Sequence, residues 1–272
     1  GAPGGSLAPA ASPEDIRAAR RAALLGAIPA MPFGAPATNV TLPAALASRI
    51  EGAAAELEGL TPYAEGLVQD GAALSTLDGS WRLLYSNAPE IVSLAKLPLG
   101  FQLGEVYQPI DVRAGAFENQ ALVQHSLGLA SGSTRVVATL RPAALGTVNS
   151  AGVRNDAGNR VDVDFERIAF TLDQILGYKT DGFLRKVVAP RVEPGSAQPA
   201  VDITYLDKDV RITRGGDASL FVLQREESPL PLLLPSARAA LRRESSESVV
   251  AGAGLGNWSR SVGPRAITGR GA

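Results

Sequence analysis

The chain has 272 residues, 45% of them hydrophobic, which is enough for one substantial core with extensions. Its 26 basic and 27 acidic residues leave a formal net charge of -1, so no overall positive field would hold a nucleic acid. The absence of cysteine excludes disulfides, thiolate metal sites and cysteine nucleophiles, and suits reducing and oxidising compartments alike.

His125 is the only histidine, which excludes a metal site or a catalytic triad built from histidines of this chain. No apolar run approaches the roughly 18 residues that span a bilayer, so we expect a soluble or peripherally bound protein. The chain opens on Gly1 without Met and without a signal segment, as a mature chain would after removal of a targeting peptide. A recombinant product would begin the same way.

The first part of the chain predicts a flexible start and two helices. Residues 1–11 are mostly Gly, Ala, Pro and Ser, a linker composition. Ser12 and Pro13 are typical of a helix N-terminus, and helical spacing then continues to Gly26. A second helix is expected from Leu42, with an apolar stripe that needs a surface to pack on. We therefore treat residues 12–76 as a helical lead-in.

Between residues 77 and 227 the apolar period changes from about 3.6 to 2, which predicts strands. Nine candidate strands follow from this pattern: Trp81–Asn87, Glu105–Asp111, Phe117–Leu127, Thr134–Leu140, Gly146–Val153, Val161–Leu172, Val201–Leu206, Val210–Arg214 and Leu220–Arg225. The predicted fold is mainly β with N-terminal helices. Eight or nine strands suffice for a lipocalin-like antiparallel β-barrel that is closed or nearly closed.

Two strands carry further detail. In Phe117–Leu127 one face is mostly apolar and includes Asn119 and His125, whereas the other face carries Glu118, Gln120 and Gln124 and is expected to meet water. In the segment from Val161 the apolar positions change from odd to even, which predicts a β-bulge near Glu166 or Arg167. Two separate strands are the alternative.

The chain then leaves the strand pattern twice. Pro190, Pro194 and Gly195 forbid a continuous element between residues 177 and 199, so we expect a mobile excursion near a barrel mouth. Residues 228–272 form a C-terminal extension with a short helix expected at Ser236–Arg243. The rest of this extension is predicted to be disordered or ordered by a partner.

Three residues predict how the barrel closes. Gly79 allows a tight turn, and Trp81 at the start of the first strand supplies an indole that can plug the barrel end. Arg225 ends the last strand and could lie across that indole, a contact of about 1 kcal/mol. The first strand and the last strand would then be neighbours.

These residues belong to a wider pattern. The segments Leu77–Ser86, 104–111, 160–165, Val201–Gly215 and Asp217–Arg225 resemble the plastid lipid-associated protein/fibrillin family, with Ile203–Gly215 the most specific. The resemblance spans most of the barrel and includes the helical lead-in, whereas no counterpart is recognised for the tail after Glu227. It implies a lipid-associated protein of the chloroplast, held at thylakoids or plastoglobules. Both the stroma and the thylakoid lumen are compatible with this resemblance.

Polar residues near the barrel rim are the candidate ligand contacts. Asp207 and Asp209 can form a hairpin turn beside Arg211 and Arg214, either as a structural turn with surface ion pairs or as a holder of a polar head group. Further candidates, each of which could equally be a hydrogen-bonded core residue, are Tyr85, Tyr107, Asn119, His125 and Tyr205. Strand parity places Tyr107, Asn119 and Tyr205 in the lumen.

The connection after the first strand is unusually apolar. It holds Ile91, Val92, Leu94, Leu97, Leu99 and Phe101. These side chains, chiefly Leu94, Leu97, Leu99 and Phe101, either contact a membrane or partner or form a lid on the barrel mouth.

Three functions are compatible with these observations. The first is a noncatalytic protein that binds a lipid or another apolar molecule, such as a carotenoid or quinone, at plastid membranes and needs no cofactor. The second is an auxiliary subunit of a large plastid assembly that uses its tails as ties. The third is an isomerase-like barrel enzyme using Asp162, Asp164 or His125. An apolar cavity within the barrel would favour the first, and a filled interior with tails lying on other proteins the second.

Overall fold

A computed structural model describes residues 11–63, 66–68, 70–94, 97–190 and 197–244. The helices are α1 (Pro13–Ala27), η1 (Pro32–Gly34), α2 (Ala44–Glu58), α3 (Gly71–Leu77), α4 (Pro89–Leu94) and α5 (Pro235–Arg243). The strands are β1 (Ala37–Thr38), β2 (Gly79–Ser86), β3 (Phe101–Asp111), β4 (Ala116–His125), β5 (Ala130–Pro142), β6 (Arg160–Ile175), β7 (Tyr178–Lys179), β8 (Arg185–Val188), β9 (Ala200–Leu206), β10 (Val210–Gly215) and β11 (Leu220–Arg225).

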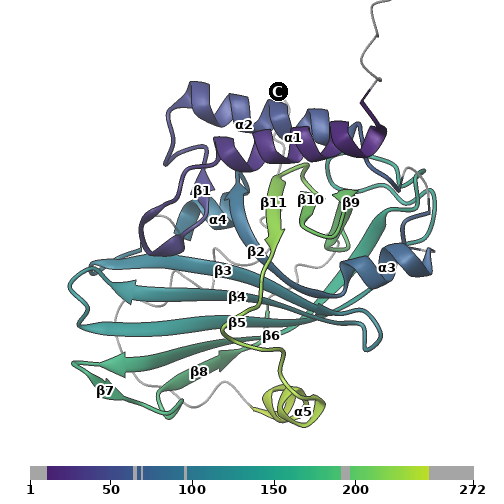
Figure 1. Ribbon diagram of the computed structural model, residues 1–272. Coiled ribbons are helices and arrows are strands. Elements are labelled where there is room, and N and C mark those ends of the chain that lie inside the picture. The colour runs from purple at the N-terminus through teal and green to yellow at the C-terminus, as the bar shows by residue number, and fades with distance from the viewer. Residues whose placement is uncertain (1–10, 64–65, 69, 95–96, 191–196, 245–272) are drawn as a thin grey trace, which may run out of the picture.

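Eight of these strands form an antiparallel ring in the order β2, β11, β10, β9, β6, β5, β4 and β3, and a pairing of β2 with β3 returns the ring to its start (Figure 1). The predicted barrel is therefore confirmed. The β2–β3 seam covers Gly79 to Arg82, and beyond it β2 pairs with β1 instead. The ring is thus joined at the end where β2 begins, which we call the floor. It parts toward the end where β3 begins, which we call the mouth.

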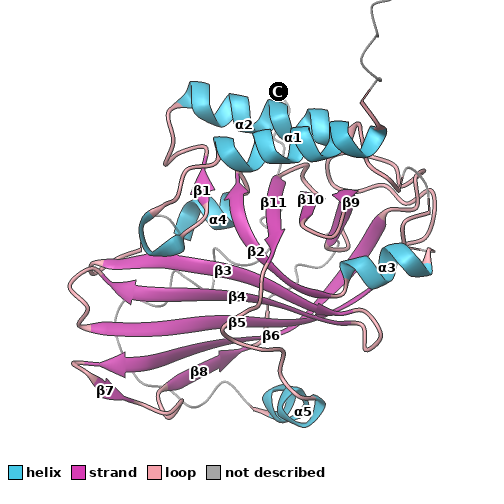
Figure 2. Cartoon of the chain, in the orientation of Figure 1, coloured by secondary structure: helices cyan, strands magenta, loops and turns pink. Residues whose placement is uncertain are grey.

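Helices α1 and α2 lie side by side across the outer face of β2, β9, β10 and β11 (Figure 2). The expected N-cap of α1 is present, since Asp15 N donates to Ser12 Oγ at 3.1 Å. The predicted stripe of the second helix packs on the sheet through Ile50, Ala54 and Leu57, all fully buried. Each large apolar side chain buried here contributes about 1.5–3 kcal/mol.

Bulges change which face of a strand points into the barrel. The predicted bulge in β6 is confirmed, because Val137 and Ala138 pair with Arg167 and Phe165 and leave Glu166 extra. β6 is continuous, so the two-strand alternative is wrong. A second bulge at Leu84 leaves Leu83 in the barrel core but turns Tyr85 toward the helices. Such register shifts reverse every side chain that follows them.

One predicted strand is absent, and two short strands were not predicted. Gly146–Val153 is a loop with one bridge, from Val148 to Arg154, because its backbone groups bond within turns and to Arg160. The excursion between residues 177 and 199 contains β7 and β8, both paired with β6. Residues 191–196 of that excursion lie outside the described part. The two strands were missed because such short segments show no alternation.

The C-terminal segment changes the outer face of the barrel. The expected helix at Ser236–Arg243 is α5, and residues 228–244 lie along the outside of β4, β5 and β6. Glu118 and Gln120 were expected to face water, but they are only 0% and 1% exposed because this segment covers them. The tail expected to be disordered, residues 245–272, lies outside the described residues, as do residues 1–10.

Candidate functional site

Trp81 closes the barrel floor. Its side chain is fully buried, and its indole Nε1 donates to the carbonyl oxygen of Leu77 at 2.9 Å. The guanidinium carbon of Arg225 lies 4.2 Å from the indole ring centroid, so the contact expected from the sequence is present. Gly79 has a φ of +114°, and a Cβ there would lie 2.5 Å from Arg225 Nη1. Glycine therefore gives the guanidinium the space it occupies.

Arg225 joins three parts of the chain at this floor. Its Nε donates to the carbonyl of Lys208 and its Nη1 to that of Asp78, both at 2.7 Å, and its Nη2 donates to Thr76. The end of α3, the start of β2 and the β9–β10 turn are thus held together. Because backbone carbonyls take up the donors, Arg225 has a structural role at the seam.

Arg211 approaches the same indole from within the barrel. Its neighbours Val210 and Ile212 pack against the helix layer, so the intervening side chain points inward. The Arg211 guanidinium carbon lies 5.2 Å from the Trp81 ring, and Nη2 donates to Gln108 Oε1. Nε has no hydrogen-bond partner among the described residues. Burial, together with the positive charge of Arg225, lowers the pKa of Arg211 to about 9.

The Asp207 turn ties the barrel to α1. Asp207 Oδ1 accepts the backbone N–H groups of Asp209 and Val210, at 2.8 and 2.7 Å. Its Oδ2 accepts from the Tyr205 hydroxyl at 2.6 Å and from Arg21 Nη1 at 2.5 Å. Burial opposes ionisation, but these donors outweigh it and lower the pKa of Asp207. The turn matches the structural alternative.

Arg211 and Arg214 do not share a rim site with these aspartates. Arg214 lies on the outer face and makes two hydrogen bonds to Glu58 of α2, both at 2.8 Å. Burial opposes the charged form, but the hydrogen bonds to Glu58 have the larger effect and raise the pKa of Arg214. Because the two arginines are three positions apart in one strand, they lie on opposite faces.

The tyrosine candidates are not in the lumen. Tyr85 and Tyr205 are turned toward the helix layer by bulges, and the Tyr85 hydroxyl donates to Glu51 Oε1 at 2.7 Å. Tyr107 lies on the outer face, opposite Gln120 in the register, and burial followed by the charge of Glu105 raises its pKa to about 12. The parity prediction was wrong for both Tyr107 and Tyr205. The extra residue Thr204 reverses the face of Tyr205, whereas Tyr107 alternates with Val106 and Ile110, which pack in the barrel core.

The three residues considered for catalysis are not together. Asp162 and Asp164 both pair with Arg141 in the half of β6 near the floor. His125 is at the mouth, where its ring makes an edge contact with Phe101 at 5.5 Å between centroids. Within the described residues no acidic or histidine cluster could hold a metal ion. The described helices are also too short or too polar to cross a bilayer.

The mouth of the barrel carries a group of exposed apolar side chains, which we call the mouth patch. Its members, with their exposed fractions, are Leu99 76%, Leu127 76%, Leu129 45%, Ile175 41%, Leu176 68%, Tyr178 78% and Phe183 89%. The loops that hold them are adjacent, because Ser126 N bonds to Gly100 O at 2.9 Å and Leu176 N to Leu129 O at 2.7 Å. In Figure 1 this end of the barrel is at the left, around the tips of β3 to β7. Such a patch typically marks a membrane or protein contact.

The predicted contact loop shares only Leu99 with the mouth patch. Leu94 is buried and Leu97 packs on the barrel core, as the lid alternative requires. Phe101 begins β3 against His125. Of the four residues chosen for membrane contact, Leu99 alone is strongly exposed, and Leu94, Leu97 and Phe101 do not form an outward apolar surface.

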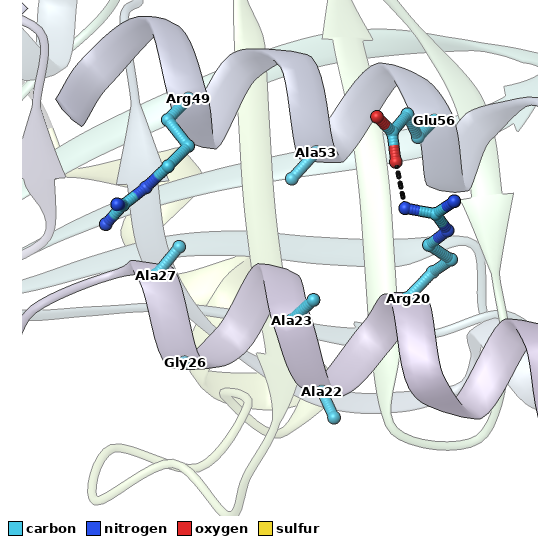
Figure 3. Close-up of a pocket in the computed structure, with 8 residues that line it drawn as sticks. All are labelled: Arg20, Ala22, Ala23, Gly26, Ala27, Arg49, Ala53 and Glu56. Carbon is cyan, nitrogen blue, oxygen red and sulfur yellow. Dashed lines mark hydrogen bonds and ion pairs between the residues drawn. The ribbon is translucent and has the colours of Figure 1, made fainter. Parts of the chain in front are cut away.

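A separate groove of about 440 Å³ lies between α1 and α2, on their outer side (Figure 3). Ala22, Ala23, Gly26, Ala27 and Ala53 line it, with Arg49 at one end and the Arg20–Glu56 ion pair of 2.6 Å at the other. This groove is outside the barrel. It exists because the small side chains that line it do not fill the space between the two helices.

Comparison with known proteins identifies the family. A family model described as PAP_fibrillin matches residues 21–224. The chain belongs to the PAP_fibrillin family. It is 32% identical over 197 residues to plastid-lipid-associated protein 6, chloroplastic, of Arabidopsis thaliana, covering 64% of this chain and 61% of that protein. It is 30% identical over 194 residues to plastid lipid-associated protein 2, chloroplastic, of Brassica campestris, covering 58% and 56%.

The chain thus spans about three fifths of the length of these curated relatives. No solved structure matches it. The relatives are named as chloroplastic proteins, which supports a chloroplast location for this PAP_fibrillin chain.

Sequence reasoning missed most of the mouth patch of this PAP_fibrillin chain. A usable signal was present, because Leu127, Leu129, Leu176 and Phe183 are large apolar residues beside turn glycines. That these separate turns meet at one end of the barrel follows only from strand order and register.

Proposed function

We propose that this chain is a noncatalytic lipid-associated protein of the plastid, which binds apolar small molecules or lipids at the surface of thylakoids or plastoglobules. The observation that carries the proposal is the mouth patch, in which large apolar side chains of neighbouring loops are exposed at the open end of the barrel. The names of its relatives, which describe plastid lipid-associated proteins, support the same function.

The mouth patch suits a lipid surface in its chemistry. Moving an apolar side chain from water into an apolar phase contributes about 25 cal/mol per Å² of apolar surface, so several side chains inserted together give a stable but reversible attachment. Lys179 and Lys186 lie beside the patch in β7 and β8. Each can add about 1 kcal/mol on an anionic membrane.

Vesicle flotation tests this proposal. We expect the wild-type chain to float with phosphatidylcholine vesicles, and more strongly when they contain phosphatidylglycerol. The variant Leu127→Asp/Leu176→Asp should remain at the bottom of the gradient. Leu145→Asp/Val148→Asp is the matched control, because these residues are 64% and 59% exposed but belong to the loop before β6, near the floor. Equal flotation of the mouth variant and the wild type would refute membrane attachment through the mouth.

The groove between α1 and α2 favours a second candidate, an auxiliary subunit of a large plastid assembly. Its small side chains leave room for a partner element, and it is accessible from outside. In that case Ala23→Arg should release the chain from large complexes on native gels of isolated plastids, whereas the mouth variant should not.

A further inference from the structure

The barrel interior contains a buried positive charge without a negative partner. Arg211 is 3% exposed and points inward from β10. Among the described residues, none of the ion pairs includes Arg211. The guanidinium of Arg225, which lies against the same Trp81 ring, repels it.

The polar groups around Arg211 are only partly satisfied. Gln108 accepts one hydrogen bond from Nη2, but Nε is buried without a partner in the part of the chain that the structure describes. Asn119 of β4 lies opposite Gln108, because the pairs Tyr107↔Gln120 and Ile110↔Phe117 flank that position. Asn119 Oδ1 is likewise buried, and none of the described residues donates a hydrogen bond to it. An unsatisfied donor on β10 and an unsatisfied acceptor on β4 thus both face the barrel interior, and Gln108 of β3 lies next to each of them.

This arrangement is unfavourable for the chain alone. Removing a guanidinium from water without pairing it is costly, and an apolar residue of similar volume would avoid that cost. The Trp81 ring compensates in part through its cation–π contact. Side chains that remain buried and incompletely paired point to a group that is bound there.

We infer that Arg211, with Gln108 and Asn119 beside it, binds the carboxylate of a long-chain acid inside the barrel. A carboxylate accepts a charge-assisted hydrogen bond from Nε and neutralises the guanidinium. The inner wall from this point toward the mouth is apolar, and it includes Val106, Ala121, Val123 and Leu103. The hydrocarbon chain would follow this wall. The inference rests on the proposed function, since it names the class of amphiphile that a lipid-associated barrel takes.

Calorimetric titration with oleate, methyl oleate and acetate tests the inference. The ester removes the negative charge and keeps the chain, whereas acetate keeps the charge and removes the chain. We expect the wild-type chain to bind one oleate at least tenfold more tightly than methyl oleate, with no measurable acetate binding. Equal affinity for acid and ester in the wild type would overturn the inference, as would tight acetate binding, which indicates a small-anion site.

Two substitutions localise the effect. Arg211→Met is expected to bind methyl oleate as the wild type does and to lose the preference for the acid, whereas Arg211→Lys keeps a weakened preference. Arg49→Met, on the exposed face of α2, is the matched control and should keep the full preference. A preference for the acid that persists in Arg211→Met overturns the inference. If Arg211→Met does not fold, the inference is decided by the preference for oleate over methyl oleate in the wild-type chain and by its weakening in Arg211→Lys.

Vesicle flotation separates this inference from the proposed function. Arg211 is remote from the mouth patch, so Arg211→Met should still float with vesicles even when its preference for the acid is lost. If the wild-type chain prefers the acid but does not float, membrane attachment fails and the interior site stands. If the wild-type chain floats but shows no preference for the acid, membrane attachment stands and the interior site fails.

Discussion

Arg160 of β6 and Asp202 of β9 form a buried ion pair with two hydrogen bonds, from Nε to Oδ1 at 2.6 Å and from Nη2 to Oδ2 at 2.9 Å. β6 and β9 pair at only three register positions, so this ion pair lies at a short join in the ring. Arg160 also donates to the carbonyls of Thr147 and Val153. The same guanidinium therefore holds the loop that precedes β6 and contributes to ring closure.

Asp202→Ala should destabilise the protein strongly, because it leaves the Arg160 guanidinium buried without its counter-charge. Loss of one partner of a buried pair typically costs about 3–5 kcal/mol. Urea unfolding followed by circular dichroism measures the change. Asp156→Ala is the control, since its ion pair with Arg154 is exposed and should contribute less than about 1 kcal/mol. Equal losses in the two variants would show that the buried pair does not support the ring.

Gly79→Ala should weaken the barrel floor. The φ of +114° is strained for alanine, at about 1–3 kcal/mol, and the new Cβ displaces the Arg225 guanidinium from Trp81. We expect a lower free energy of unfolding and a red shift of tryptophan emission as the indole loses its cover. Gly52→Ala in α2 meets nothing within 4 Å and should stabilise the helix by about 0.5–1 kcal/mol. An unchanged free energy of unfolding for Gly79→Ala would contradict this prediction, because it would show that the turn accommodates a Cβ without strain.

Glu118→Ala should release the C-terminal segment from the barrel wall. The Glu118 carboxylate is fully buried, where it pairs with Arg135 and accepts the backbone N–H of Leu233 at 2.9 Å. Without it, Arg238 also loses a neighbouring negative charge. Hydrogen exchange should accelerate in residues 228–244, and only weakly elsewhere. Glu56→Ala, an exposed pair partner on α2, is the control, and full protection of the segment in Glu118→Ala would contradict the role of this carboxylate.

Stability should fall at alkaline pH because buried tyrosines resist ionisation in the folded state. Burial raises the pKa of Tyr85, Tyr107 and Tyr205, and the neighbouring carboxylates of Glu51, Glu105 and Asp207 raise these values further. The value for Tyr107 is about 12, against 10.0 for an unperturbed tyrosine.

Below about pH 10 folded and unfolded chains both keep these protons, so the contribution to stability is complete. Between pH 10 and about 12 the unfolded chain releases protons that the folded chain retains, so stability decreases. Urea unfolding across this range measures the slope. Replacing the three tyrosines by phenylalanine should flatten it, whereas Tyr178→Phe, at an exposed position, should not. If the free energy of unfolding depends on pH equally in both variants, groups other than these three tyrosines cause the loss of stability.

Much of the fold could be predicted because the relevant signals are local. The Ser12 cap, the alternation that defines β3 to β6 and the phase change at Glu166 are all readable within a few residues. Trp81 and Arg225 are far apart in the sequence, in the first and last long strands of the barrel. Their contact could still be predicted, because these are the two strands that must meet when a sheet closes.

The candidate site was less predictable, because it depends on which surfaces face each other. Parity was correct for Asn119 but wrong for Tyr107, and wrong for Tyr205, where a bulge intervenes. The outer face of β4 was expected to be exposed to water. It is covered by residues 228–244, which come from a distant part of the chain, so the sequence of β4 gives no sign of that cover. The mouth patch depends on strand register in the same way.

The sequence by itself determined most of the element types, the antiparallel ring, the indole at its floor and the family, because periodicity and turn residues act over short distances. Only the tertiary structure decided which side chains are inside the barrel, which are covered and which are exposed together at the mouth. The physical reason is that burial and unpaired charge are properties of contacts between strands far apart in the chain, and a single bulge or an added covering segment reverses them.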